Sequence, residues 1–435
     1  MWIGIDDTDS KKGMCTTYLV GDILKELWKY GLELTRYPRL IRLNPNIPWK
    51  TRGNGAVALE VGVPDKKLEK IGWMQKNIYR CTPRSTVIDF EKLKEGLQRV
   101  IQEQAELDAE GTNPGVVITQ IKPPYSVYTK TVKKIVTLKE TQAVLDMIGA
   151  YTLGYKNKRG LIGATAAVAW RPYIDKTYEL LTYGNKSTIS TEHVIKMDYC
   201  CPSTFDNYDY ENRHIQITPN APGPVIYGVR GDNEKELKKA MRMLHVPDIE
   251  RWFLFETNQG TDDHLQKTKI DNIHPYESVI VTGYVASKPR AITGGHLIFS
   301  FGNTKKIDCA CYEPTKNFRS IIRYLCPGDK ITVYGGIRKN PFTLNIEKIQ
   351  IHALVAIHRK VENPLCPRCH RHMKSIGKNN GYRCRRCGIK TGEEKAKIVP
   401  IKRQLCPIFY EVPVVARRHL AKPLKRMKNI TYQKK

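Results

Sequence analysis

Three carboxylates within four positions follow a short apolar run near the N-terminus. The run WIGI at residues 2–5 predicts a buried strand, and Asp6, Asp7 and Asp9 follow it directly. Neighbouring carboxylates repel one another, so a bound cation explains them better than a turn capped by Asp and Ser. Mg²⁺ prefers one or two protein carboxylates together with phosphate oxygens. We therefore expect a Mg²⁺–phosphate site at this strand end.

The start of a helix follows these acids. Thr16 and Thr17 come after Cys15, and apolar residues then recur at helical spacing until Gly31 ends the pattern. The first N–H groups of a helix lack partners within it and bind phosphate readily. The two threonines therefore lie where a phosphate would be held.

Two further loops combine cations with glycines, which let the backbone approach an anion. They contain Lys50, Arg52, Gly53 and Gly55 in the first, and Lys158 and Arg159 in the second. The first loop can also be an exposed hairpin, and the glycines of the second can also serve close helix packing. The chain has no GxxxxGK[ST] motif and no kinase-type HRD or DFG set. Any use of ATP therefore needs a different phosphate site.

A second strand ending in acids lies near the middle of the chain. Residues 252–255 predict a strand, and Glu256, Asp262 and Asp263 follow it. We expect this strand in the same sheet as the first. Its carboxylates suit a small cationic substrate, although solvated loop acids give the same spacing.

The composition indicates a polyanionic partner. The 435 residues include 72 Lys and Arg against 43 Asp and Glu, a net charge of +29, which favours nucleic acid unless it reflects a general bias of the proteome. No apolar run is long enough for a membrane span, and the N-terminus does not have the pattern of a signal peptide. We therefore expect a cytoplasmic protein whose 12 cysteines are thiols or metal ligands.

Residues 274–355 change to short alternating strands. Five of them, with a helix over 318–325 between the third and the fourth, follow the plan of an OB-fold, which binds single-stranded nucleic acid. An SH3-like barrel is the alternative, and the position of the helix favours the OB-fold.

Two CxxC pairs form the most specific motif. Cys366 and Cys369 are separated by fourteen residues from Cys384 and Cys387, a spacing typical of a structural zinc site. Four thiolates fill the tetrahedral shell, so this Zn²⁺ should not be catalytic. His370 and His372 lie off the symmetrical spacing, and the adjacent pair Cys200-Cys201 lacks metal spacing. The tail after Glu411 carries eight Lys and Arg and no acid, so we expect an RNA-contacting arm or a disordered segment.

These motifs together resemble one family. IGIDDTDS, GMCTTYL, RLNPNIPWKTRGNGA, GYKNKRGLIGA, GPVIYGVRG and FETNQGTD, followed by the barrel and the CxxC pairs, are similar to the archaeal tRNA agmatinylcytidine synthetases, TiaS. The resemblance implies a multidomain α+β protein with a kinase-like α/β domain, an inserted ferredoxin-like domain, an OB-fold β-barrel and a zinc ribbon. We place the catalytic domain at 1–109 and 191–270, the ferredoxin-like domain at 110–190, the OB-fold at 271–358, the ribbon at 359–395 and a basic C-terminal extension at 396–435.

The resemblance also implies a reaction. The 2-oxo group of the wobble cytidine of an isoleucine tRNA with a CAU anticodon would be activated by ATP, which ends as AMP and two phosphates. Agmatine would then displace the phosphate, and the product would pair with A. No obligate protein partner is evident.

By matching motifs, Asp6, Asp7 and Asp9 would bind Mg²⁺–ATP, and Thr16 would accept phosphate, with Thr17 as the adjacent alternative. Our candidates for phosphate or RNA contact are Lys50, Arg52, Gly53, Gly55, Lys158 and Arg159. Glu256, Asp262 or Asp263 would bind the guanidinium of agmatine.

Two other functions compete with this interpretation. A non-enzymatic single-strand-binding protein would explain the barrel and the ribbon but not the 270 residues before them. A Mg²⁺-dependent nuclease would use the three aspartates but has no histidine base near them.

Overall fold

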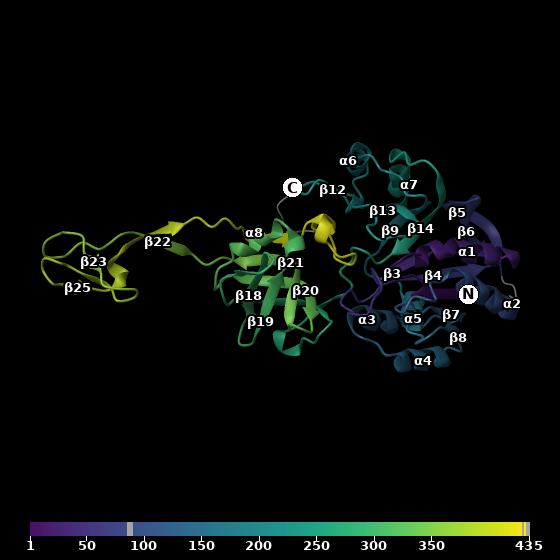
Figure 1. Cartoon of the computed structure of the whole chain (residues 1–435), viewed down its shortest axis with the longest axis horizontal. Coiled ribbons are helices and arrows are strands. Elements are labelled where there is room, and N and C mark those ends of the chain that lie inside the picture. Colours follow the sequence, from purple (N-terminus) through teal and green to yellow (C-terminus); the bar gives the residue numbers. More distant parts are fainter. Residues whose placement is uncertain (85–89, 429, 432–435) are drawn as a thin grey trace.

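The computed structural model describes residues 1–84, 90–428 and 430–431. A large α/β body holds the N-terminus, a β-barrel lies beside it, and a small ribbon extends far beyond the barrel (Figure 1). Within the described residues, no helix is long and apolar enough to cross a membrane.

A 12-stranded sheet forms the centre of the body. The first strand, β1 (Trp2–Asp6), pairs antiparallel with β4 (Gly55–Gly62) on one side and with β7 (Gly115–Thr119) on the other. Beyond them the sheet continues through β8 (Tyr151–Gly154) at one edge and, toward the other edge, through β3 (Arg39–Arg42), β14 (Ile249–Thr257), β9 (Thr177–Gly184), β13 (Val225–Gly231) and β10 (Thr204–Phe205).

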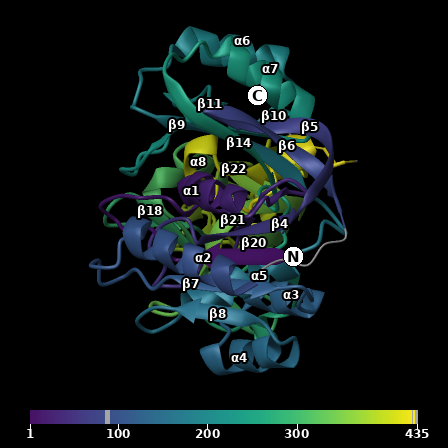
Figure 2. The same cartoon turned by 90° about the vertical axis from the view of Figure 1, so that its right-hand side faces the viewer.

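Alternation along β1 sends its side chains to two different helix layers (Figure 2). Ile3 and Ile5 pack in a core with helix α1 (Thr16–Lys29) and helix α2 (Phe90–Gln104). Gly4 faces helix α5 (Gly160–Ala169), where a Cβ would lie 2.4 Å from the carbonyl oxygen of Ala164. The small residues of α5 therefore lie almost against the strand that ends at the aspartates. The amphipathic pattern of residues 86–108 predicts a helix, and α2 lies within this range, with positions 86–89 outside the described residues.

The second unit of the body is built from β9, helix α6 (Thr191–Cys200), β13, helix α7 (Glu234–Met243) and β14. Both helices pack on one face of the antiparallel strands β13, β9 and β14. Helices α3 (Tyr125–Lys133) and α4 (Leu138–Met147) instead belong with α5. The division into 110–190 and 191–270 stays a prediction, and the sheet connects the two ranges because β9 pairs with both β13 and β14.

The prediction that the two strands followed by acids lie in one sheet is confirmed. β14 lies in the same sheet as β1, with β3 and β4 between them. A long hairpin of β5 (Pro64–Met74) and β6 (Lys76–Pro83) extends the sheet by pairing with β14, and it was not predicted from the sequence. The short strand β2 (Glu33–Leu34) pairs with β4, and β11 (Tyr208–Asp209) pairs with β12 (His214–Ile215).

The OB-fold prediction is confirmed. Five strands close a barrel: β16 (Ser278–Val285), β18 (His296–Gly302), β19 (Lys306–Cys311), β20 (Lys330–Arg338) and β21 (Thr343–Ala353). β19 runs parallel to β21, and β16 pairs with both β18 and β20. Helix α8 (Phe318–Arg323) precedes the fourth barrel strand, as predicted. The flanking strands β15 (Leu265–Lys267) and β17 (Arg290–Ile292) extend the sheet.

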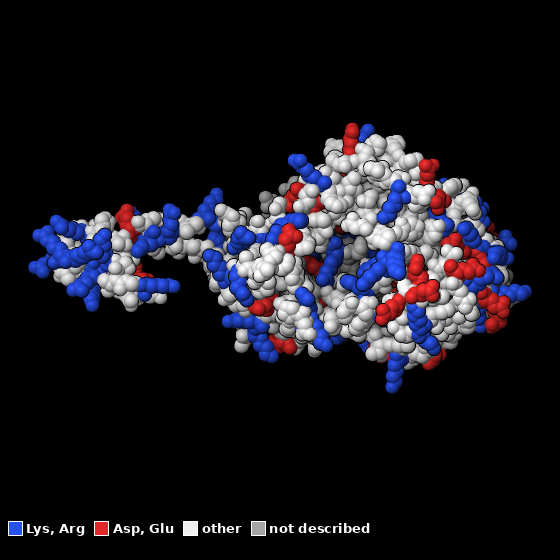
Figure 3. Space-filling model, in the orientation of Figure 1, with Lys and Arg blue, Asp and Glu red and all other residues white. Residues whose placement is uncertain are grey.

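A two-stranded stalk carries the ribbon away from the barrel (Figure 1). It consists of β22 (Ile357–Glu362) and β26 (Lys397–Ile401). The ribbon itself contains β23 (Lys374–Ser375), β24 (Tyr382–Arg383) and β25 (Lys390–Thr391). Lys and Arg side chains cover much of its visible surface (Figure 3).

The C-terminal segment is not the free basic arm expected from its charge. After β27 (Phe409–Glu411) pairs with β21, residues 412–428, which we call the strap, return to the body. Leu420 and Leu424 are buried, and Arg417 forms ion pairs with Asp206 and Glu411. The prediction of a disordered tail is therefore wrong for the strap, whose arginines and Lys422 pair with acids of the chain.

Candidate active site

A cavity of about 800 Å³ lies where β1 ends and α1 begins. Most of the residues singled out in the sequence line it: Asp6, Asp7, Asp9, Thr16, Thr17, Lys50, Arg52, Gly53, Gly55 and Arg159. The fold thus brings together three segments that are far apart in the chain. The cavity is continued by the second unit of the body and by the strap.

Asp7 connects three of these segments. Its Oδ1 accepts a hydrogen bond from Thr51 Oγ1 at 3.2 Å. Its Oδ2 accepts bonds from Asn113 Nδ2 and from Arg159 Nη2, each at 3.3 Å. The backbone of Asp7 has a φ of 58°, which Asp and Asn tolerate better than other side chains with a Cβ. The residue is therefore held in one orientation by partners from the loop before β7, the first basic loop and the start of α5.

The other two aspartates carry unusual electrostatics. Burial, reinforced by the charge of Asp7, raises the pKa of Asp6 well above its usual range. Burial also raises the pKa of Asp9 to about 6, although Arg52 opposes this shift from 3.6 Å. A divalent cation would restore the ionised form of both carboxylates. This donor set therefore fits Mg²⁺, whose preferred ligands are carboxylate and phosphate oxygens.

The N-terminus of α1 lines the cavity through Cys15, Thr16 and Thr17. Cys15 precedes the helix without a side-chain cap, so the first N–H groups remain available to an anion. Thr16 Oγ1 accepts a hydrogen bond from Thr8 Oγ1 at 3.0 Å, and Thr17 Oγ1 lies 3.0 Å from Cys15 Sγ. Both threonines line the cavity, so either hydroxyl can meet a bound phosphate.

The first basic loop contributes Arg52, which holds a neighbouring loop, and Lys50, whose ammonium donates to the carbonyl oxygen of Pro45. Arg52 donates to the carbonyl oxygens of Met14 at 2.9 Å and Gly13 at 2.8 Å, which holds the loop before α1 in place. Lys50 is exposed at the cavity, where desolvation by the surrounding wall lowers the pKa of its ammonium to about 8. Gly53 leaves room for Arg42, because a Cβ there would lie 2.8 Å from Arg42 Nη1.

Four predicted site residues lie outside the cavity lining. Lys158 is exposed. Glu256 binds Lys176 Nζ at 2.5 Å, and Asp262 binds Lys348 Nζ at 2.6 Å. Asp263 accepts a bond from the hydroxyl of Tyr128 at 2.6 Å. The three acids thus have partners within the fold, and Asp262 joins the body to the barrel and, through the backbone N–H of Lys422, to the strap.

Sequence reasoning missed the opposite wall of the cavity. There Glu179 Oε1 accepts a bond from Arg230 Nε at 3.1 Å, and Arg42 Nη2 lies 4.0 Å from Glu179 Oε2. Asp206 and His419 complete this wall. Glu179 and Arg230 face each other in the register of β9 and β13, a pairing that no short spacing in the sequence reveals.

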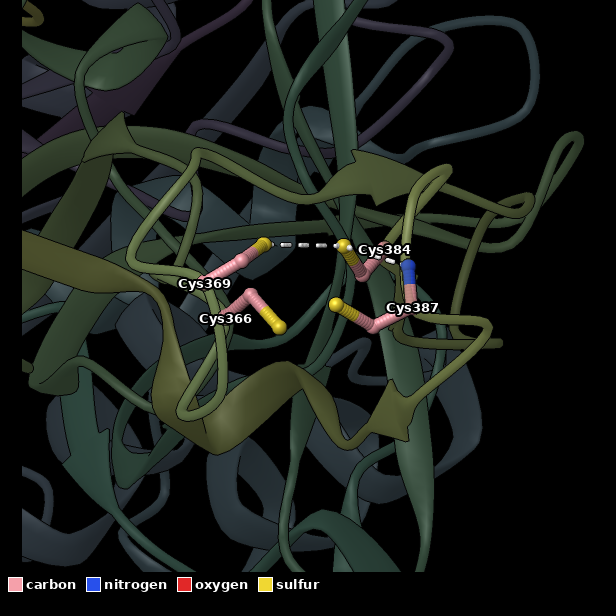
Figure 4. A group of neighbouring side chains, drawn as sticks. All are labelled: Cys366, Cys369, Cys384 and Cys387. Carbon is pink, nitrogen blue, oxygen red and sulfur yellow. Dashed lines mark hydrogen bonds between the residues drawn. The ribbon is translucent and has the colours of Figure 1, made fainter.

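The four predicted cysteines form the zinc-ribbon site (Figure 4). The sulfur atoms of Cys366, Cys369, Cys384 and Cys387 all lie within 4.8 Å of one another. The backbone N–H of Cys387 donates to Cys384 Sγ and lowers the pKa of this thiol to about 7. Four sulfur ligands in this arrangement match structural Zn²⁺. Neither His370 nor His372 belongs to the cluster among the described residues.

Family models match most of the chain. The TiaS TCKD domain matches residues 2–157, the TiaS FLD domain 158–264 and the TiaS C-terminal zinc ribbon domain 363–405. The isoleucine-tRNA 2-agmatinylcytidine synthetase TiaS of Methanocaldococcus jannaschii is 40% identical over 98% of both chains. The protein of the same name from Pyrococcus horikoshii is 38% identical over 97% of this chain and 96% of its own.

Solved structures agree with this similarity. A complex of TiaS with its isoleucine tRNA and ATP has a TM-score of 0.83 at 38% identity. A complex of TiaS with the same tRNA, AMPCPP and agmatine has a TM-score of 0.80 at 36% identity. Each comparison covers 98% of this chain and 97% of the other. Both the domain order and the chain length are thus shared with these proteins.

Proposed function

Since the chain belongs to the TiaS family, we propose that it is an ATP-dependent ligase that replaces the 2-oxo group of the wobble cytidine of a CAU-anticodon isoleucine tRNA with agmatine. The observation that carries this proposal is the cavity, in which the aspartates, threonines and cations of the family-like motifs meet. The relatives match this chain over nearly their whole length.

The chemistry explains why one cavity needs both acids and cations. A pyrimidine oxygen is a poor leaving group, and phosphorylation turns it into a good one. The amine then forms a C–N bond to C2 while the C–O bond breaks and phosphate leaves. We propose that Asp6, Asp7 and Asp9 hold Mg²⁺, which neutralises phosphate charge when bound. Lys50, Arg52 and Arg159 add cationic partners for the phosphates.

The threonines at the start of α1 suit a phosphoryl acceptor. We propose Thr16 for this role, with Thr17 as the neighbouring alternative. Support comes from the position of both hydroxyls in the cavity beside the free N–H groups of the helix. Exposed Lys158 lies next to this site and is our candidate for an RNA phosphate contact.

Agmatine needs an acidic partner for its guanidinium. Glu256, Asp262 and Asp263 were the predicted candidates, and each would have to exchange an internal partner for agmatine. Besides the Asp6–Asp9 group, Glu179 and Asp206 are the acids among the described cavity-lining residues. Steady-state kinetics of Glu179→Gln and Glu256→Gln distinguish these possibilities, since only the variant of the binding acid should raise the KM for agmatine.

The tRNA must reach a site that lies inside the body. A stacked base is inaccessible to these side chains, so the wobble cytidine has to be extruded from the anticodon loop into the cavity. The barrel and the basic ribbon offer a long positively charged surface for the rest of the tRNA (Figure 3). Because tRNA is the substrate, we propose that the protein works in the cytoplasm.

A product assay tests the proposed function. The purified protein is incubated with Mg²⁺, ATP, agmatine and the CAU-anticodon tRNA, and the digested tRNA is analysed by mass spectrometry. We expect AMP and a nucleoside heavier than cytidine by agmatine minus water. Unchanged cytidine with intact tRNA and ATP present would refute the proposal, whereas cleaved tRNA would favour the nuclease.

A further inference from the structure

The strap places a histidine in the wall of the cavity. Two backbone hydrogen bonds fix its position: Gly260 N donates to the carbonyl oxygen of His419 at 2.7 Å, and Asp262 N donates to that of Leu420 at 2.8 Å. The side chain of Leu420 is buried in a core with α5. The backbone at His419 is thus fixed by contacts that do not involve the imidazole ring.

The imidazole faces the same space as the aspartates and threonines. It packs over the first basic loop, since a Cβ on Gly53 would lie 3.3 Å from Nε2 and 3.4 Å from Cδ2 of His419. Gly53 therefore allows the ring to approach the loop closely. Any larger residue there would push the ring and the loop apart.

Neither ring nitrogen serves the fold through a hydrogen bond. Nδ1 is buried without a partner among the described residues, and Nε2 has none in the same part of the chain. A histidine that only stabilised the fold would be expected to have a partner for its buried Nδ1, because an unpaired buried polar atom is destabilising. The ring therefore has hydrogen-bonding capacity left for a ligand.

Cations surround this ring. Arg42 from β3, Arg230 from β13 and Lys50 from the first basic loop face it, with Glu179 of β9 between the two arginines. The charge of Arg42, followed by burial, holds the pKa of His419 well below its usual range. The imidazole is therefore neutral before substrates bind. Bound phosphates would offset the cations and make the ring more basic.

The amine step of the proposed reaction releases a proton that needs an acceptor. A free amine attacks C2, the C–N bond forms, and the nitrogen becomes positively charged while the phosphate leaves with the electrons of the C–O bond. Building on the proposed function, we propose that His419 is a catalytic residue that accepts this proton from the amine nitrogen at Nε2. The cations around the ring restrict this role to the phosphate-loaded cavity.

A two-stage assay tests this role. The protein is first incubated with Mg²⁺, ATP and the tRNA without agmatine, and agmatine is then added and the modified nucleoside is followed. We expect His419→Ala to retain AMP formation and nucleotide affinity but to slow the amine stage by about 10²–10⁴-fold. Added imidazole should restore part of the lost rate, and His245→Ala, in a separate surface groove, should behave as the original protein does.

Several results would overturn the proposal. They are equal loss in both stages, no loss in the amine stage, or loss without rescue by imidazole. His419→Gln guards against misfolding of the alanine variant, since it keeps a polar side chain but cannot take up the proton. It should fold and show the same selective loss, and full activity of this variant would also refute the role. If the unaltered protein makes no modified nucleoside, the proposed function itself fails, which is a different outcome.

Discussion

Arg159 Nη2 lies 3.3 Å from Asp7 Oδ2 and joins the start of α5 to the end of β1 across 152 positions of sequence. Asp7 also accepts from Thr51, so one carboxylate orients a residue from each basic loop region. This contact explains why acids and cations from separate motifs form one site rather than three surface patches.

Replacement of Asp7 should separate catalysis from tRNA binding. Asp7→Asn keeps the size of the side chain and tolerates the φ of 58°, but it removes the charge that a metal needs. We expect ATP turnover to fall by about 10–100-fold or more, with little change in tRNA affinity. Turnover is measured by AMP formation and affinity by filter binding. Asp271→Asn, an exposed acid before the barrel, is the control, and parallel loss of both properties would make Asp7 structural.

The contact between α5 and Asp6 allows a steric test. In Gly163→Ala the new Cβ would lie 1.8 Å from Asp6 Oδ2, so the carboxylate or the helix must move. We expect weaker Mg²⁺-dependent ATP binding by calorimetry and a loss of about 1–3 kcal/mol in unfolding free energy, despite the higher helix propensity of Ala. Gly111→Ala is the matched control, because a Cβ at Gly111 meets nothing within 4 Å. Equal behaviour of the two variants would show that α5 does not position Asp6.

The affinity for ATP should depend on pH at both ends of the range. Lys50, with a pKa of about 8, is charged below that value and loses its charge as pH rises through it. We expect ATP to bind about tenfold more weakly at pH 9 than at pH 7. Lys50→Arg should abolish this alkaline loss, because a guanidinium stays charged.

At acidic pH, ATP affinity should fall as the pH is lowered. Asp9, with a pKa of about 6, becomes protonated as pH falls. The Mg²⁺-dependent part of ATP affinity should therefore fall below pH 6 in the original protein and in Lys50→Arg alike. Titration calorimetry at several pH values measures the alkaline and the acid loss of ATP affinity. An alkaline loss that persists in Lys50→Arg would exclude Lys50 as its origin.

Loss of zinc should unfold the ribbon alone. Cys384→Ser removes one of four sulfur ligands, and we expect about one zinc fewer per chain by elemental analysis. The thermal transition of the body should stay unchanged, because in the part of the chain that the structure describes the ribbon extends from the barrel on the stalk of β22 and β26 (Figure 1). Cys406→Ser, an exposed cysteine outside the cluster, should keep the zinc. Zinc retention by Cys384→Ser would rule out the four-cysteine site.

Local patterns predicted those parts of the molecule that local physics determines. The apolar run WIGI predicted β1, and the CxxC spacing predicted the zinc site, because both depend on neighbours in the chain. The barrel was also predictable, since its helix lies at a fixed place in the order of strands.

Long-range pairing set the limit of this reasoning. Strand β5 contains many charged residues and gains its place by pairing with β14. Glu179 meets Arg230 only through the register of two strands. The strap is held at the cavity by ion pairs, buried leucines and backbone hydrogen bonds to residues that are distant in the sequence. The positive charge of this segment predicted RNA as its partner. In the structure Arg417 pairs with Asp206 and Arg418 with Glu347.

Because the strap is C-terminal, the cavity is completed late during synthesis of the chain. The ribosome makes the aspartates, threonines and basic loops first, then the barrel and the ribbon, and only afterwards residues 412–420. A nascent chain with a folded body therefore still lacks the part of the cavity wall that the strap supplies with His419. The same is true of a chain cut short by a premature stop codon after the ribbon. Such products would carry the nucleotide-binding motifs without a finished cavity around them.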